Sequence, residues 1–348
     1  MDETQTVASP MRPQETESAQ FAGFWRRIFA ALVDAIILGI AGWAVAIPFY
    51  NQLILWGPYG RALGFPVALL YFAILNSSIG GGGTLGKKAL GIRVVSRDGK
   101  AIGLPRSLWR AVVYLVPMYL NGFDLSFLQL NPFQSTVASA LQIFFVFGVL
   151  LATIYLYLAN WRTRQVMHDL AAGTFVVRSA GVRVTQRINP IHLIVVGLLL
   201  AASLSAAPLI LKFGPAKLQS QFGNMVGTNF PELNAIQAAV LKSPNVLSAA
   251  VNDQTSTFWT DGHAVTTTSI IVTVVWRGAP QSPELAADEI AKRVLQVSPE
   301  ILDRQKLLVI VRYGFDIGIT QSWNSNGYPF TPEEWRMRIQ RALPNNSI

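Results

Sequence analysis

The hydrophobic positions of this chain form long uninterrupted runs instead of alternating with polar ones. Residues 28–47 contain a single charge, Asp34, and residues 62–79, 136–159 and 191–211 are further apolar runs. An α-helix of about 20 residues crosses a hydrocarbon core of about 30 Å. The pattern therefore predicts an α-helical multi-pass membrane domain, followed by a last transmembrane helix at 191–211.

Positive charge is concentrated in two short segments between these runs. The first contains Lys87, Lys88, Arg93, Arg97, Lys100, Arg106 and Arg110, and the second contains Arg162, Arg164, Arg178, Arg183 and Arg187. Basic loops beside membrane spans face the cytoplasm and attract anionic lipid head groups. Residues 212–348 hold 12 basic and 11 acidic side chains, so the net charge of +9 does not indicate nucleic-acid binding.

The apolar segment 108–128 is less regular, because polar residues interrupt it. Since both basic segments must lie on the cytoplasmic side, the number of crossings between them is even. We therefore expect 108–128 to cross the membrane with a kink at Pro117. The result is five spans, at about 28–47, 62–79, 108–128, 136–159 and 191–211, with a cytoplasmic N-terminus and an external C-terminus. Residues 1–20 are polar and are expected to form a disordered cytoplasmic tail.

Two loops of the membrane part are predicted to form small cytoplasmic β-hairpins. Residues 90–104 alternate between apolar and polar positions and contain the turn-forming pair Asp98 and Gly99. Residues 173–185 contain a similar pair of short apolar stretches. Because both loops lie on the same membrane face, the two hairpins could pair into one sheet.

Residues 219–348 show the alternation of helical and strand patterns that is typical of a soluble α+β domain. Helical patterns cover 231–242, 283–296 and 332–343, and strand patterns cover 246–252, 264–277 and 307–313. Ser282 and Thr331 are expected to cap two of the helices. This order suggests a ferredoxin-like or related two-layer sandwich. Five spans place this domain outside the cytoplasm.

The composition narrows the functional classes. Hydrophobic residues make up 51% of the chain and charged residues 14%, with a mean hydropathy of +0.37, whereas soluble domains carry about 25% charged residues. The absence of Cys excludes disulfides, iron–sulfur clusters and thiol catalysis, and the three His are scattered. No nucleophile–base pattern is visible. We therefore expect no metal, no cofactor and no enzymatic activity.

Asp34 is the most informative residue. A carboxylate inside an apolar helix costs about 2.5–3.5 kcal/mol unless it is paired, hydrated or protonated. Arg27 precedes it by about 10 Å along the helix axis, so a partner from another segment is expected. The candidates are Lys87, Arg110 and the segment around His168 and Asp169. Two roles stay open for Asp34: a buried ionic brace between helices, or a group in a transport or proton-relay path.

Residues 81–88, with the sequence GGGTLGKK, contain the spacing of a phosphate-binding GxxxxGK loop. Lys88 occupies the position where that motif requires Ser or Thr, and an apolar span instead of a strand precedes it. Nucleotide binding is therefore not favoured. We expect the glycines to form a flexible exit from the second span, with Lys87 and Lys88 at anionic head groups.

Three blocks of the chain carry a family resemblance. They are FAGFWRRIFAALVDAIILG at 21–39, GGGTLGKKALGIRVVSRDGK at 81–100 and RQVMHDLAAGTFVV at 164–177. Together they resemble the RDD family of bacterial multi-pass membrane proteins, which is named for one Arg and two Asp. The resemblance covers about residues 21–178 of an expected membrane domain at 21–190. It implies that the signature residues are Arg27, Asp34 and Asp169, with Gly86, Lys87 and His168 in the surrounding motifs.

The resemblance implies an integral protein of the bacterial inner membrane. One hypothesis is a small cation/proton exchanger that uses Asp34, with the other signature residues, Lys87 and Arg110 in supporting roles. Five spans are few for a transporter, so this hypothesis favours a homo-oligomer. The alternative is a non-enzymatic scaffold or anchor that presents residues 219–348 to an extracytoplasmic protein partner.

Overall fold

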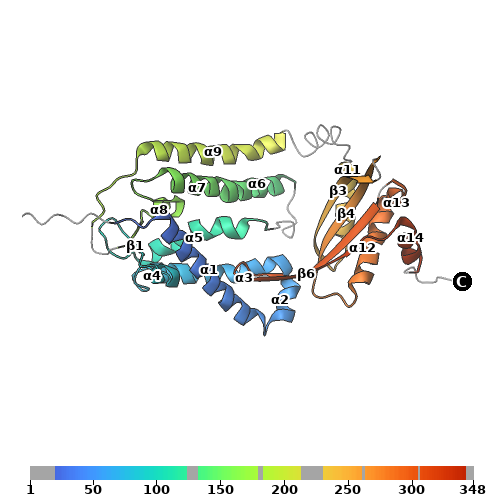
Figure 1. Ribbon diagram of the computed structural model, residues 1–348, viewed down its shortest axis with the longest axis horizontal. Coiled ribbons are helices and arrows are strands. Elements are labelled where there is room, and N and C mark those ends of the chain that lie inside the picture. The colour runs from blue at the N-terminus through green and yellow to red at the C-terminus, as the bar shows by residue number, and fades with distance from the viewer. Residues whose placement is uncertain are drawn as a thin grey trace, which may run out of the picture.

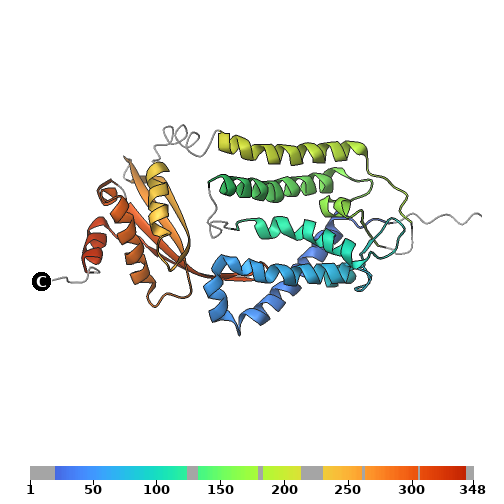
Figure 2. The same cartoon turned by 180° about the vertical axis from the view of Figure 1, so that it is seen from behind.

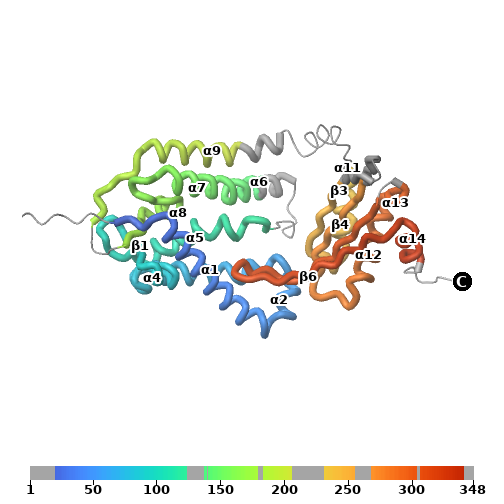
Figure 3. The backbone as a smooth tube through the Cα atoms, viewed as in Figure 1, coloured from blue at the N-terminus to red at the C-terminus, as the bar shows by residue number. Residues whose placement is uncertain are grey.

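The computed structural model describes residues 20–123, 132–178, 183–212, 230–260, 263–304 and 306–341 (Figure 1). Figure 3 shows the course of the backbone as a tube. Within these ranges, long helices from the first part of the chain lie at one end of the molecule. An α/β domain from the last part lies at the other end (Figure 1). The expected N-terminal tail falls almost wholly outside the described residues.

The helical part contains four long helical stretches and several short turns in the described residues before α9. Its elements are α1 (Phe24–Ala46), α2 (Tyr50–Trp56), the 3-10 turn η1 (Gly57–Gly60), α3 (Arg61–Asn76), α4 (Leu85–Ala89), α5 (Leu104–Leu120), α6 (Pro132–Ile143), a π-helical turn (Phe144–Gly148), α7 (Val149–Ala159), α8 (Met167–Ala171) and α9 (Pro190–Lys212). The long helices run roughly side by side (Figures 1 and 2).

The surface of α1 has two distinct sides. One side buries Arg27, Ala30, Asp34, Leu38, Gly42 and Ala46, which recur at helical spacing. The other side leaves Leu32, Ile36 and Ile40 more than half exposed. A large apolar surface next to a buried stripe with small and polar residues is the pattern of a helix between protein and lipid.

Three described stretches are long and apolar enough to cross a membrane: Phe24–Ala46, Tyr50–Asn76 and Ala140–Ala159. They correspond to the expected spans at 28–47, 62–79 and 136–159. The expected span at 108–128 corresponds to α5, which has 17 residues and ends at Leu120, before the undescribed residues 124–131. In α9, Pro190–Ser205 is a shorter apolar stretch. A total of five spans therefore stays a prediction.

The two expected hairpins are replaced by a single small sheet. Strand β1 (Arg93–Val95) pairs antiparallel with β2 (Phe175–Val177), so each loop contributes one strand. A turn does form after β1, where the Gly99 N–H donates to the Ser96 carbonyl over 3.0 Å. The segment after this turn does not form a second strand beside β1, because Ile102 forms a parallel bridge with Ser77 instead. The expected turn of the second hairpin falls on residues 179–182, outside the described residues.

The C-terminal domain contains the expected helices and strands, with one further strand and one further short helix among the described residues. Its elements are α11 (Phe230–Val240), β3 (Val246–Thr260), β4 (His263–Trp276), α12 (Pro283–Val297), α13 (Ile301–Arg304), β5 (Lys306–Asp316), β6 (Gln321–Tyr328) and α14 (Pro332–Arg341). Both predicted caps are present: Ser282 Oγ accepts from the Leu285 N–H, and Thr331 Oγ1 accepts from the Glu334 N–H.

The sheet differs from a ferredoxin-like one. Its strand order is β3-β4-β5-β6, with a parallel pair at the centre and an antiparallel hairpin on each side. A ferredoxin-like fold contains the order βαββαβ, whereas here α12 joins two hairpins. Strands that are neighbours in the sequence are therefore also neighbours in the sheet.

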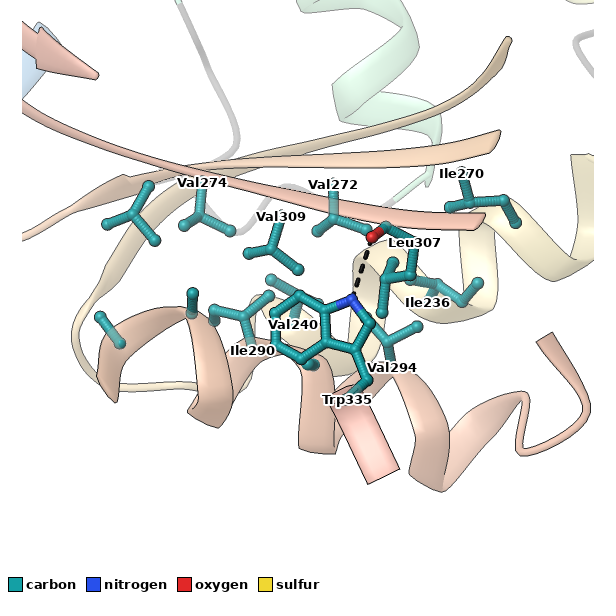
Figure 4. Close-up of a cluster of buried hydrophobic side chains, with 14 of the residues drawn as sticks. Ile236, Val240, Ile270, Val272, Val274, Ile290, Val294, Leu307, Val309 and Trp335 are labelled. Carbon is teal, nitrogen blue, oxygen red and sulfur yellow. Dashed lines mark hydrogen bonds between the residues drawn. The ribbon is translucent and has the colours of Figure 1, made fainter. Parts of the chain in front are cut away.

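Helices α11, α12 and α14 pack on one face of this sheet. Figure 4 shows the core, in which Val272, Val274 and Val309 from the strands meet Ile290 and Val294 from α12. Trp335 of α14 is fully buried there, and its indole N–H donates to the Leu307 carbonyl over 3.0 Å. The aromatic ring and its satisfied donor fix α14 on the sheet.

The hairpin of β5 and β6 connects the two ends of the molecule. Phe315 and Ile317 are buried against Ala46, Leu53 and Ile54 from α1 and α2. The hairpin tip continues between the helices, and Ile319 packs against the apolar cluster of α1, α3 and α5. At Gly64 of α3, a Cβ would lie 1.7 Å from the Ile317 carbonyl oxygen, so only glycine permits this approach.

Candidate functional site: a buried charge cluster

Two arginines from different helices meet at Asp169. Arg27 of α1 places Nη1 3.0 Å from Asp169 Oδ2, and Arg110 of α5 places Nη2 2.7 Å from Asp169 Oδ1. The Asp169 side chain is fully buried. Burial by itself raises the pKa of this carboxyl, but the charges of Arg110 and Arg27 outweigh it and hold that pKa below its usual range. Asp169 therefore stays ionised and joins α1, α5 and α8.

The local sequence around Asp169 makes this arrangement compact. Asp169 lies in the first turn of the short helix α8, where its Oδ2 accepts the Val166 N–H over 3.5 Å. Thr174 follows the helix, and its hydroxyl accepts from Arg110 Nε over 3.3 Å. Strand β2 then begins at Phe175. The segment thus carries the carboxylate, a second polar partner and the strand that holds both in place.

Asp34 is 1% exposed and has no cationic partner within 4 Å among the described residues. Its carboxylate accepts three hydrogen bonds from uncharged donors: the Tyr71 hydroxyl at 2.7 Å, the Thr84 hydroxyl at 2.6 Å and the Gly86 N–H at 2.8 Å. The prediction of a basic partner from another segment is therefore wrong. Asp34 instead ties α1 to α3 and α4 through neutral groups.

The close contact between α4 and α1 at Gly86 explains why neutral donors, and no basic side chain among the described residues, bind the Asp34 carboxylate. A Cβ on Gly86 would lie 2.1 Å from the Ala30 carbonyl oxygen, so the backbone of α4 touches that of α1. This approach brings the Gly86 N–H directly to the carboxylate. Thr84 caps α4 by accepting the Lys87 N–H, while its own hydroxyl proton points to Asp34.

Lys87 turns into the protein instead of reaching lipid head groups, which corrects the expectation for this residue. Its Nζ donates to Asn76 Oδ1 over 2.8 Å and lies 5.9 Å from the centre of the Phe72 ring. Lys88, one position later, is exposed. The preceding glycine turn is not a flexible exit, because the Val94 N–H donates to the Gly82 carbonyl over 2.6 Å.

The environment of Lys87 and His168 disfavours their charged forms. Burial, reinforced by the charge of Arg110, lowers the pKa of the Lys87 ammonium to about 7. The same two causes lower the pKa of His168 to about 3. The His168 ring contacts the Tyr114 ring at 5.1 Å between centres. His168 is therefore neutral at physiological pH, and Lys87 changes its charge near neutrality.

A small cavity lies between these side chains. It has a volume of about 50 Å³, and its lining consists of Arg27, Ala31, Asp34, Phe72, Lys87, Arg110, Tyr114, Tyr157, His168 and Val176. A water molecule needs about 10–15 Å³ on this measure, so the space suits a small ion with some of its water. With Lys87 protonated, Arg27, Arg110 and Lys87 exceed Asp34 and Asp169 by one positive charge. With Lys87 neutral, the five groups balance.

The sequence prediction named the residues that meet in this region. The structure brings together all seven: Arg27, Asp34, Gly86, Lys87, Arg110, His168 and Asp169. It adds Tyr71, Asn76 and Thr84, which sequence reasoning missed. Thr84 had a signal, since it follows the glycines as a helix cap, and Asn76 had one as a polar side chain near the end of the second apolar run, whereas Tyr71 has no comparable feature. Among the described residues, no group of His, Asp and Glu could hold a metal ion.

Comparison with known proteins identifies the class of this helical part. Residues 21–173 match the sequence model of the RDD family, so the resemblance is confirmed for this segment. Together with the apolar helices, the match indicates a membrane protein. α9 and the C-terminal domain lie outside it.

A curated relative matches part of the chain. The "Uncharacterized protein YckC" of Bacillus subtilis (strain 168) is 28% identical over 159 residues, which make up 44% of this chain and 83% of that protein. No solved structure matches the chain significantly.

Proposed function

We propose that the helical part of this protein exchanges protons for monovalent cations across the bacterial inner membrane. In this proposal Asp34 binds the cation and Lys87 carries the proton. The observation that carries it is that both side chains line one cavity of about 50 Å³. Neither forms an ion pair with an opposite charge among the described residues.

The charge balance of the cavity supports a one-for-one exchange. When Lys87 releases its proton, the summed charge of the five ionised groups falls from one positive to zero. A monovalent cation that then binds at Asp34 restores the earlier value. Because a buried site with low dielectric resists a change of net charge, occupancy by the Lys87 proton and occupancy by the cation exclude each other.

The groups around Asp34 suit a cation. The Tyr71 and Thr84 hydroxyls now donate to the carboxylate, but each hydroxyl also has oxygen lone pairs and can rotate to accept or coordinate. Three oxygen-bearing groups thus converge beside the cavity. The ion pairs of Asp169 with Arg27 and Arg110 keep the surrounding helices in place, and the single negative charge of Asp169 offsets one of the positive charges.

The proposed orientation follows from where the basic residues lie. The charge cluster at the start of α1 lies at the end of the helical part that carries both basic segments, and the α/β domain lies at the opposite end (Figure 1). Basic loops face the cytoplasm. We therefore infer a cytoplasmic charge cluster and an extracytoplasmic C-terminal domain, with α5 and α9 completing the five spans.

The test measures cation-dependent proton movement in inverted membrane vesicles. The wild type is compared with Asp34→Asn and Lys87→Met, and Lys88→Met serves as the matched control because Lys88 is exposed on the same turn. We expect a response to Na⁺, Li⁺ or K⁺ in the wild type and in Lys88→Met. In both cavity variants the cation-dependent proton movement should be at least tenfold smaller than in the wild type at equal protein abundance.

A purely structural role for Asp34 predicts another result. In that case Asp34→Asn lowers the abundance and thermal midpoint of the protein, and any exchange scales with the amount of folded protein. Absence of a wild-type signal between pH 6 and pH 9 would also refute the proposal.

A second function, an anchor for the α/β domain, is favoured by a different observation. The β5–β6 hairpin inserts among α1, α2 and α3, so packing contacts, in addition to the covalent connection of the chain, hold the C-terminal domain against the helical part. An anchor predicts that deletion of residues 219–348 removes the cellular function while the helical part stays in the membrane. A function that survives this deletion contradicts it.

A further inference from the structure

A second cavity, of about 500 Å³, lies where the start of α1 meets the end of α7. Its charged lining is Arg26, Arg27, Arg164 and Arg178, accompanied by Trp25, Tyr157 and Trp161, with no carboxylate among the described lining residues. This volume is typical of a site for a small organic ligand. Four guanidinium groups without a carboxylate define a site for an anion.

Several N–H groups of these guanidinium side chains are available to a ligand. Arg27 uses Nη1 for Asp169, and the Tyr157 hydroxyl lies near its guanidinium, but Nε and Nη2 are buried and form no hydrogen bond of standard geometry within the described part of the chain. Arg164 and Arg178 form no ion pair with any described carboxylate. Buried guanidinium donors without partners are unfavourable, and the fork of N–H groups matches the oxygens of a phosphate.

Arg164 is held in an unusual conformation beside this cavity. Its φ of 51° makes it the only described residue other than glycine in the left-handed region. Its guanidinium lies against the start of α1, where Nη1 would be 3.3 Å from a Cβ on Gly23. A residue of this type keeps such a backbone only where the surroundings demand it, and such positions cluster at ligand sites.

The remaining walls are apolar and open to the outside. Trp25 is 67% exposed and Trp161 is 76% exposed, and Phe24 and Leu158 add further apolar surface. Exposed Trp residues at the end of an apolar helix are typical of the membrane–water interface. A free phosphate ion would leave these walls in water, whereas a lipid would cover them with its glycerol and acyl carbons.

We propose that this cavity binds the phosphate group of an anionic phospholipid, with Arg164, Arg178 and the free donors of Arg27 as its ligands. The site is a second cavity that shares Arg27 with the exchange cavity, and the inference does not depend on ion exchange. It differs from a general attraction of basic loops to the bilayer because it requires a defined pocket and a stoichiometry of one lipid per chain.

The experiment measures the thermal unfolding midpoint of the full chain in a neutral detergent with added phosphatidylglycerol, phosphatidylcholine or inorganic phosphate. A ligand that binds only the native state raises the midpoint. We expect a rise of several degrees with phosphatidylglycerol and none with the other two additions. Native mass spectrometry should find one retained phosphatidylglycerol per chain.

The variant Arg164→Gln/Arg178→Gln should lose both the shift and the retained lipid. The matched control Arg93→Gln/Arg162→Gln removes two exposed charges that do not line the cavity, and it should keep both. An equal rise with phosphatidylcholine, an equal rise with phosphate alone, or retention of the effect in the first double variant would each overturn the proposal. The three additions test the wild type even if that variant does not fold.

Discussion

Arg61 and Asp316 are 255 positions apart in the chain, yet two N–H groups of the Arg61 guanidinium converge on Asp316 Oδ2 at 2.8 and 2.9 Å. Arg61 begins α3, and Asp316 ends β5. The same arginine also donates to the carbonyls of Tyr119 and Asn121 at the end of α5. The Arg61 side chain therefore joins the β5–β6 hairpin to α3 and α5, both of which lie in the part of the chain that matches the RDD family.

This pair should make a measurable contribution to stability. We expect a coupling of about 1–3 kcal/mol between Arg61→Gln and Asp316→Asn in a double-mutant cycle, because the bonds are charge-assisted and partly buried. The readout is unfolding of the full chain in detergent. The exposed pair Arg183 and Asp98 provides the control and should couple far more weakly. Equal coupling in both cycles would show that the hairpin contact is no stronger than a surface pair.

Gly64→Ala tests how closely the hairpin fits the helices. Alanine would stabilise an ordinary helix position by about 1 kcal/mol relative to glycine. At Gly64 the added methyl meets the Ile317 carbonyl, so we expect a loss of stability and faster proteolysis of the C-terminal domain. In Gly197→Ala of α9 nothing described lies within 4 Å of the added carbon, and no loss is expected. A Gly64→Ala protein as stable as that control would contradict the docked hairpin.

Asp169→Asn should be among the most damaging single changes. It leaves the buried guanidinium groups of Arg27 and Arg110 without their counter-charge, which costs about 3–5 kcal/mol. The exposed Asp98→Asn serves as the comparison and should change stability by about 0.5 kcal/mol or less. Both are measured as unfolding midpoints at equal detergent concentration. If the two variants unfold alike, Asp169 does not hold the helices together.

Stability should depend on pH through Lys87. Its pKa in the folded protein is about 7, below the usual 10.5, so between these values the unfolded chain binds more protons than the native one. Protonated Lys87 therefore costs native-state stability below pH 7, and that cost is relieved as the pH rises towards 10. Lys87→Met should flatten this part of the stability profile, whereas Lys88→Met should leave it unchanged. A wild-type profile without such a rise, or one that Lys87→Met does not alter, contradicts the lowered pKa.

The sequence located the charged site well because its signals are local. A carboxylate in an apolar run identifies Asp34, and the resemblance to the RDD family adds Arg27 and Asp169, without any knowledge of the fold. The pairing among them was not predictable. It depends on how closely α4 approaches α1 at Gly86, and on the position of α8, neither of which has a periodic pattern.

In the C-terminal domain, periodicity and caps predicted α11, α12, α14 and three of the strands, but not the short helix α13. β6 was missed because its sequence, QSWNSNGY, is polar and the strand lies at the edge of the sheet. The insertion of the hairpin was missed for another reason. The residues that enter the helices lie at the end of β5 and in a short turn, and their partners lie in the first 120 residues of the chain.

The separation of Arg61 and Asp316 also sets an order of events during synthesis. At about 5–20 residues per second, the ribosome needs on the order of ten to fifty seconds to pass from the first residue to the second. For that interval α1 and α3 exist without the hairpin that later fills the space beside Gly64. The helices must therefore tolerate lipid or water there before the last strands are made. Docking of the hairpin is therefore a late step of assembly. A chain that ends before residue 316 lacks the hairpin, and the surface beside Gly64 that the hairpin would cover stays exposed to lipid or water.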